Sequence, residues 1–346
     1  VAKDEIVLGS IQDLSGPIAG FGKQVRLGLM LRVDEINEQG GINGRKINLI
    51  SLDDAFSPPK TVAQTRKLVE EDEVLFLWQN VGTGPNSAIH KYVNQKKIPH
   101  LFISTGATKF GDPKNFPWTI SGNLPYQTEA QVYARYVLKT KPDAKIAVLY
   151  QNDDFGKDLL KNLKDGLGAK ASMIVAEVSY ELADPTVDSQ ILSLKGSGAD
   201  TLFTFATPKF ASQTIRKVYD IGWKPLHFVT YPVSSVAAVL VPAGLEKSVG
   251  LITARYQKDI NDPQWDNAPD VKAYREFMKK YYPDGDPKDG FNAAGFFQGH
   301  LLAQVLKQCG NDLTRENVMR QAANLKNVEL PILLPGIKIN TSPTDF

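Results

Sequence analysis

The chain has 346 residues, enough for about two domains. Hydrophobic residues make up 42% and charged residues 23%, which is ordinary for a globular protein and excludes disordered and fibrous classes. There are 40 basic and 38 acidic residues, so the net charge is +2. This balance argues against binding to nucleic acid or to an anionic membrane, because both need a concentrated basic face. The single cysteine, Cys309, excludes an intramolecular disulfide and a thiolate metal cluster.

The first part of the chain alternates between short apolar strands and amphipathic helices. Strands are predicted at 6–10, 46–53, 74–78 and 100–103, and helices at 22–39, 61–71 and 87–96. Alternation of strand and helix with short loops predicts a parallel sheet covered on both faces.

The same pattern starts again after residue 123. Helices are predicted at 128–140, 156–167, 189–197 and 209–221, and strands at 145–150, 173–179, 201–205 and 227–230. Two long helices (270–281 and 292–308) and a proline-broken, strand-like tail (328–339) follow. We therefore predict an α/β protein with two doubly wound parallel-sheet lobes, and we place the first boundary near 121–123.

Tests for catalytic and cofactor motifs are negative. Gly82-Thr83-Gly84 follows a strand and opens a helix, but it lacks the third glycine and the acid of a dinucleotide site, and no phosphate loop occurs. The four histidines have no partner at helical spacing, so we expect no metal, no cofactor and no catalytic triad. The paired acids Asp53-Asp54 and Asp153-Asp154 favour helix caps and turns over acid–base chemistry.

Hydroxyls and glycines gather just after two predicted strands, in Gly82-Thr83-Gly84 and in 104–108 (Ser-Thr-Gly-Ala-Thr). In a doubly wound sheet this is the ligand edge, where helix N-termini present free N–H groups to anions. The alternative is that these residues only cap their helices. Two such clusters in one domain favour a ligand cleft.

Six segments together resemble the leucine/isoleucine/valine-binding protein family over essentially the whole chain. They are 16–22 (GPIAGFG), 40–45 (GGINGR), Asp53-Asp54, the two hydroxyl clusters, and 152–156 (NDDFG). The family consists of extracytoplasmic solute-binding components of ABC importers with the type I periplasmic binding-protein fold. The resemblance implies a small-molecule ligand, permease subunits in the membrane as partners, and a periplasmic chain whose signal peptide has been removed.

The resemblance also implies two lobes joined by three chain crossings, near 121–123, 251–253 and 328–330. Lobe 1 would comprise 1–121 and 252–329, and lobe 2 would comprise 122–251 and 330–346. The lobes would close by a hinge motion on a ligand held in the cleft between them.

The family's ligand-binding residues carry over to specific positions here. Positions like Thr83, Gly106 and Thr108 hold the ligand carboxylate in the family, and Phe21 and Phe155 fall where ligand-facing aromatic residues occur. We add six candidates: Gly84, Ser104, Thr105, Thr207, Tyr231 and Phe291.

The sequence departs from the amino-acid binders of this family in two segments. These binders place acids there for the ligand ammonium, whereas residues 122–127 and 231–235 here contain none. Burying an unpaired ammonium costs several kcal/mol. We therefore expect a small carboxylate without an amino group, an aromatic acid such as a hydroxybenzoate or hydroxycinnamate, with its ring between Phe21, Phe155, Tyr231 and Phe291.

Three alternatives stay open. The chain could bind branched-chain or other amino acids, with Asp153 or Asp154 replacing the missing acid. It could be an amide or urea sensor-receptor of the same fold. An enzyme, which we do not expect, would need a base such as His90 or His100 beside the hydroxyl clusters.

Overall fold

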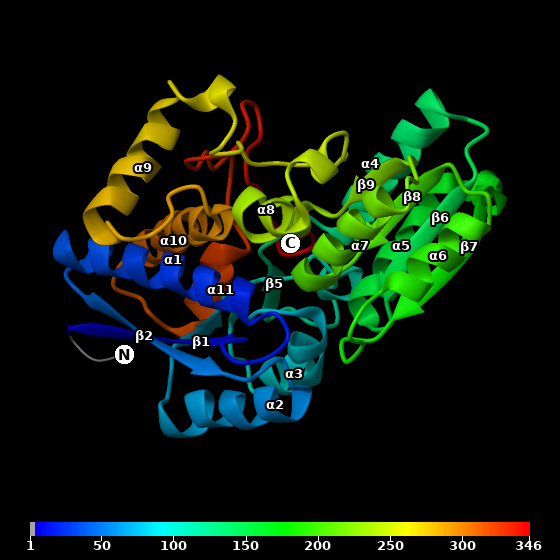
Figure 1. Ribbon diagram of the computed structural model, residues 1–346. Coiled ribbons are helices and arrows are strands. Elements are labelled where there is room, and N and C mark those ends of the chain that lie inside the picture. The colour runs from blue at the N-terminus through cyan, green and yellow to red at the C-terminus, as the bar shows by residue number, and fades with distance from the viewer. Residues whose placement is uncertain (1–3) are drawn as a thin grey trace. The chain divides into compact units, whose positions relative to one another are not determined.

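A computed structural model describes residues 4–346 (Figure 1). Residues 1–3, assigned above to lobe 1, lie outside the described part. The chain divides into two units: unit 1 is the described chain up to Asn123 together with Tyr256–Phe346, and unit 2 is Leu124–Arg255. No helix among residues 4–346 is long and apolar enough to cross a membrane.

Unit 1 contains a five-stranded parallel sheet in the order β2-β1-β3-β4-β5. Its strands are β1 (Glu5–Gln12), β2 (Lys46–Asp53), β3 (Phe76–Trp78), β4 (His100–Ile103) and β5 (Thr119–Ser121). The chain leaves β1 towards β2 on one side and later adds β3 on the other, so the switch point lies between β1 and β3. In open α/β sheets ligands bind outside the carboxyl ends of the strands at such a point.

Helices cover both faces of this sheet. α1 (Ala19–Glu38) and α10 (Gly290–Cys309) lie on one face, and α2 (Pro58–Arg66) and α3 (Thr83–Gln95) on the other (Figure 1). The two long helices approach so closely that a Cβ on Gly28 would lie 2.7 Å from the carbonyl oxygen of Asn292. α9 (Pro269–Tyr281) packs through Phe277 against Phe296 of α10, and α11 (Arg315–Ala322) follows α10. α2 continues into a π-helical turn, Lys67–Glu71.

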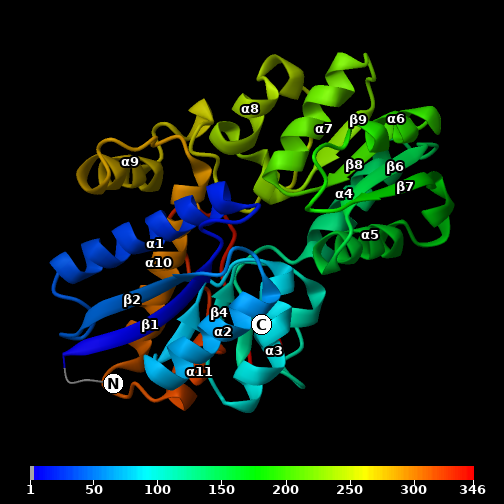
Figure 2. The ribbon, with the colours of Figure 1, turned by 60° about the horizontal axis from the view of Figure 1, so that its bottom comes forward.

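Unit 2 contains a four-stranded parallel sheet in the order β7-β6-β8-β9. Its strands are β6 (Ile146–Gln151), β7 (Ile174–Tyr180), β8 (Thr201–Phe205) and β9 (Leu226–Val229). One face carries α4 (Tyr126–Thr140) and α5 (Asp154–Leu167), and the other α6 (Asp188–Gly196) and α7 (Pro208–Asp220) (Figure 2). The remaining helical segments are short: Thr108–Phe110, Gly168–Met173, Tyr231–Ser234, Val236–Leu240, α8 (Val241–Ala243), Glu246–Ser248 and Pro263–Trp265.

The prediction of two doubly wound parallel sheets is confirmed, and the differences are local. β5 and α11 were not predicted, and α3 begins at Thr83 instead of 87. Pro85 falls in the first turn of α3, where a missing N–H breaks no helical hydrogen bond, so the helix extends through what reads as a loop.

The tail also differs from the expectation. Residues 330–346 belong to unit 1, although we assigned them to lobe 2, and 328–339 form isolated bridges instead of a strand. Lys258 donates to the carbonyl of Ile332 at 2.7 Å, and the Ile332 N–H donates to the Asp270 carboxylate at 2.7 Å. These bonds attach the tail to α9 and to the segment that begins at 256.

Candidate functional site

The two hydroxyl clusters of the sequence meet at the carboxyl ends of β3 and β4, where they form a single hydroxyl cluster. The hydroxyl oxygens of Thr83 and Thr105 are 2.8 Å apart, and Thr83 is 3% and Thr105 0% exposed. Ser104 donates its N–H to the carbonyl of Asn80 at 2.9 Å, while Gly82 donates to the carbonyl of Ser104 at 3.2 Å, so the two loops are joined. The structure thus brings together Thr83, Ser104 and Thr105, three of the residues predicted from sequence.

The glycines and Thr108 border this cluster. Gly84 lies in the first turn of α3, and a methyl group there would meet nothing within 4 Å. Gly106 is buried, whereas Thr108 is exposed and begins a short 3-10 helix. The amino end of α3 has N–H groups without helical acceptors and the positive end of the helix dipole, so this edge can hold an anion.

Strained backbone marks the same edge of the sheet. Four non-glycine residues at or just past the carboxyl ends of β2, β3 and β4 have left-handed φ angles: Ala55 (50°), Phe56 (56°), Gln79 (57°) and Phe102 (52°). Such conformations cost about 1 kcal/mol or more each and cluster at functional sites. They are held by side-chain hydrogen bonds, including one from the Gln79 amide to the carbonyl of Phe102.

Aromatic rings lie near this edge in unit 1. Phe21 of α1 and Phe291 of α10 form an edge-to-face pair with ring centroids 4.6 Å apart. Phe56, which sequence reasoning missed, packs directly on Gly82, so that any side chain at position 82 would overlap its ring. The sequence signal was its place two residues after Asp54.

The two acids of that pair stabilise the turn. Asp53 accepts the N–H groups of Leu14 at 2.8 Å and Ala55 at 2.9 Å, and Asp54 accepts those of Phe56 at 2.9 Å and the hydroxyl of Thr61 at 2.7 Å. Burial raises the pKa of Asp54 to about 6, against the opposing effect of these bonds. The turn interpretation of this pair is therefore confirmed.

In unit 2, two candidates flank the switch point between β6 and β8. Phe155 is the second residue of α5, capped by Asp153, which accepts the Phe155 N–H at 3.0 Å. Its ring lies 5.4 Å from that of Tyr126. Thr207, at the start of α7, donates its hydroxyl to the Gln151 side chain at 3.2 Å.

The third candidate in unit 2, Tyr231, follows β9. The guanidinium of Arg255 lies 5.7 Å from the centre of its ring. Its N–H donates at 2.6 Å to Oε1 of Glu129, which is 1% exposed. Burial raises the pKa of Glu129 to about 7, opposed by hydrogen bonds from Tyr133 and Tyr231. Sequence reasoning missed Glu129, although it lies two residues past the segment 122–127 that we searched for an acid.

The histidines named as possible bases are both buried. His90 stacks on Phe116 with ring centroids 4.0 Å apart, and burial lowers its pKa to about 4. His100 is fully buried, which lowers its pKa to about 3. Both rings are therefore neutral at pH 7.

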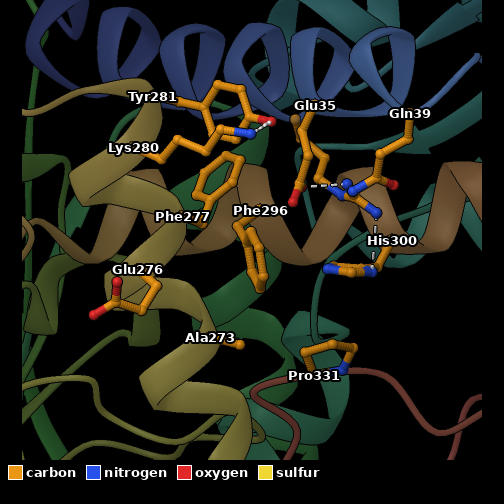
Figure 3. A pocket seen from close by; sticks show the side chains of 11 residues that line it. Glu35, Gln39, Ala273, Glu276, Phe277, Lys280, Tyr281, Phe296, His300 and Pro331 are labelled. Carbon is orange, nitrogen blue, oxygen red and sulfur yellow. Dashed lines mark hydrogen bonds and ion pairs between the residues drawn. The ribbon is translucent and has the colours of Figure 1, made fainter.

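A cavity of about 590 Å³ also lies in unit 1, between α1, α9 and α10 (Figure 3). Phe277 and Phe296 form its apolar wall. Arg32 pairs with Glu35 and donates to Nδ1 of His300 at 3.4 Å, so three of the polar groups that line the cavity bind one another. None of the residues that line it is a predicted ligand residue, so it is separate from the hydroxyl cluster.

Comparison with known proteins identifies the family. The family model described as "Periplasmic binding protein" matches residues 5–345. A Leu/Ile/Val-binding protein homolog 7 of Brucella abortus is 23% identical over 318 residues, which are 89% of this chain and 78% of that protein.

Two solved structures show the same fold. A branched-chain amino acid ABC transporter protein from Thermus thermophilus with bound valine has a TM-score of 0.89 at 14% identity, covering 100% of this chain and 91% of that one. A solute binding protein of an ABC transporter from Rhodopseudomonas palustris, in complex with 3,4-dihydroxybenzoic acid, has a TM-score of 0.81 at 20% identity, covering 95% and 87%. The chain therefore belongs to the periplasmic binding protein family.

Proposed function

We propose that this protein captures a small carboxylate without an ammonium group in the periplasm, an aromatic acid of the hydroxybenzoate or hydroxycinnamate type. It would pass this acid to the permease subunits of its transporter. The observation that carries the proposal is the buried Thr83–Thr105 hydroxyl pair at the amino end of α3. Hydroxyls, a positive helix end and strained loops together suit a carboxylate.

The acids of unit 2 support the absence of an ammonium group. Glu129 is buried, and its Oε1 already accepts hydrogen bonds from Tyr231 and Tyr133. Asp153 accepts from two backbone N–H groups of α5 and from the Gln151 amide. A ligand ammonium would have to displace hydrogen bonds that these carboxylates already accept. An unpaired buried ammonium is strongly disfavoured.

The aromatic residues support a ring. Phe21 and Phe291 in unit 1, and Phe155, Tyr126 and Tyr231 in unit 2, supply flat apolar surfaces near the carboxyl ends of their sheets. A ligand ring would pack edge-to-face against these aromatic side chains. The Rhodopseudomonas palustris protein with bound 3,4-dihydroxybenzoic acid shares this fold.

A branched-chain amino acid is the second candidate. The Thermus thermophilus protein with bound valine has the same fold, and the Brucella relative carries a Leu/Ile/Val-binding name. For this ligand Asp153, Asp154 or Glu129 would have to give up a present partner to pair with the ammonium.

Calorimetric titration and thermal shift with leucine, valine, benzoate, 4-hydroxybenzoate and 4-coumarate test the proposal. At about 100 times its Kd, a bound aromatic acid stabilises the protein by roughly 2.7 kcal/mol, without being converted. Binding of leucine or valine with no response to the three aromatic acids would contradict the proposal. Chemical conversion of any compound would contradict a pure binding role.

A further inference from the structure

Glu129 is a carboxyl group buried in the first turn of α4. Its Oε1 accepts the Tyr231 N–H at 2.6 Å and the Tyr133 phenol at 2.7 Å. Burying a carboxyl group is unfavourable, and an apolar side chain of similar size is often as stabilising or more so. Perturbed buried acids of this kind are more frequent at functional sites than elsewhere.

The phenol of Tyr133 extends this contact to the chain crossing. Its oxygen accepts the N–H of Ala254 at 3.1 Å and lies 3.3 Å from the hydroxyl of Thr253. It also lies 2.9 Å from the carbonyl oxygen of Val229, the last residue of β9. Glu129 and Tyr133 therefore connect three backbone segments: the end of β9, the start of the Tyr231 segment, and the crossing at 253–254.

The crossing is itself paired with the sheet of unit 2. Ile252 bridges Phe228, and the Val229 N–H donates to the carbonyl of Ile252 at 3.0 Å. Arg255, directly after the pair of residues that Tyr133 holds, lies over the Tyr231 ring. The backbone and the ring of Tyr231 are thus both fixed by groups that depend on Glu129 and Tyr133.

We propose that Glu129 is a positioning residue for ligand binding, which holds the Tyr231 segment and the 253–254 crossing in the conformation that receives the ligand. This inference rests on the proposed function, because it takes Tyr231 as a ligand contact. Glu129 itself acts through Tyr231 and Tyr133. A glutamine keeps an acceptor oxygen at this place, whereas an alanine leaves the buried Tyr231 N–H without one.

The test compares Glu129→Gln, Glu129→Ala and the matched control Trp223→Phe. The control removes another buried hydrogen bond of unit 2, from the indole N–H to the carbonyl of Ala199 before β8. Hydrogen exchange of peptides covering 230–235 and 251–255 is measured on the full ligand-free chain. We expect at least tenfold faster exchange in both peptides for Glu129→Ala, near wild-type exchange for Glu129→Gln, and no change there for Trp223→Phe.

Affinity for the five panel compounds is the second measurement. For each compound that wild type binds, Glu129→Ala should weaken binding about tenfold, Glu129→Gln less than threefold, and Trp223→Phe not at all. If Glu129→Ala does not fold, Tyr133→Phe replaces it and should accelerate exchange in 251–255 more than in 230–235.

Unchanged local exchange, or equal acceleration throughout unit 2, would overturn the positioning role. An affinity of Glu129→Ala equal to that of Trp223→Phe would also overturn it. If wild type binds no aromatic acid, the proposed ligand class fails by itself, and the exchange data still decide the role of Glu129.

Discussion

The first strand of each unit leads into the same local arrangement. A parallel strand ends at a buried glutamine, Gln12 in β1 and Gln151 in β6, and the helix that follows contains the triplet Phe-Gly-Lys, at 21–23 and 155–157. In both triplets a Cβ on the glycine would overlap a backbone oxygen of the preceding turn, that of Asp13 or of Gln151. The helix start therefore touches the strand end, which places Phe21 and Phe155 at matching positions beside the two switch points.

The units differ in backbone strain and in buried titratable groups. All nine non-glycine residues with left-handed φ among residues 4–346 lie in unit 1, while unit 2 uses glycine wherever this conformation occurs. Unit 1 also contains three of the four histidines, of which His90 and His100 are buried and His300 is half-buried. The strained backbone of the described chain is therefore confined to unit 1, where four of the nine residues lie at the carboxyl ends of strands, and unit 2 is the more relaxed of the two.

The largest expected effect is a loss of stability in acid that begins in unit 1. Burial lowers the pKa of His90 to about 4 and of His100 and His300 to about 3. Below pH 6.5 the unfolded chain binds protons at these positions and the folded chain does not, so the free energy of unfolding falls as pH drops from 6.5 towards 3. A fully buried histidine contributes up to about 4 kcal/mol to this loss.

Unit 2 should resist acid better. Burial lowers the pKa of His227 to about 3, which also lowers the free energy of unfolding as the pH drops. The raised pKa of Glu129 has the opposite effect, because between pH 4.5 and 7 the folded state keeps a proton that the unfolded state has lost. Asp54 offsets part of the effect in unit 1. Hydrogen exchange at pH 7 and 4.5, corrected for intrinsic rates, should show earlier loss of protection in unit 1. Earlier loss of protection in unit 2 would contradict the predicted difference in acid stability between the units.

The second prediction tests the matching triplets. Gly22→Ala and Gly156→Ala should each destabilise the protein by about 3 kcal/mol, because the methyl group must displace backbone. Gly20→Ala, in the same helix α1 but with nothing within 4 Å, is the control and should stabilise by up to about 1 kcal/mol. Denaturant unfolding measures all three, and a mild effect at only one of the two triplets would show that they are not equivalent.

The third prediction compares how much the hydroxyl groups of the two units contribute to ligand binding. Thr83→Val should weaken binding of the panel compound that binds most tightly by about tenfold or more, with Thr83→Ser closer to wild type. Thr207→Val should cost less than threefold, because its hydroxyl already donates to Gln151. Thr108→Ala, at an exposed position, should weaken binding without loss of stability. Unchanged affinity in Thr83→Val, by calorimetry, would mean that Thr83 only joins two loops.

The smallest effect concerns the ends of two equivalent helices. After α3 the residue with left-handed φ is Lys97 (54°), and after α7 it is Gly222 (63°); in each case the next N–H bonds back to the helix, from Ile98 to Val93 and from Trp223 to Val218. Lys97→Gly should stabilise by up to about 1 kcal/mol, and Gly222→Lys should destabilise by about 1 kcal/mol. Melting curves of the two variants should therefore shift in opposite directions.

The sequence predicts the sheets well because their strands are continuous apolar runs between polar turns. It misses β5, since three residues after Pro117-Trp118 are too few to show a period. It misses the early start of α3 because Gly82, Gly84 and Pro85 are typical of a loop.

The site is predictable only where its residues follow a strand within a few positions. Thr83, Ser104 and Thr105 do so, and they meet in the structure. Glu129 could not be found in this way, because its partner Tyr231 lies 102 residues further along the chain and no local pattern links the two. The contact of Phe56 with Gly82 could not be predicted either, because it depends on the left-handed turn that directs the Phe56 ring to Gly82.

The close crossing of α1 and α10 has a consequence for synthesis on the ribosome. Arg32 and His300, which meet there, are 268 residues apart, whereas unit 2 is one continuous segment, 124–255. Unit 2 can therefore fold as soon as it has emerged, while α1 must wait with an uncovered apolar face until α10 is made. During that interval the nascent chain should be prone to aggregation and should be a substrate for chaperones that bind exposed apolar helices.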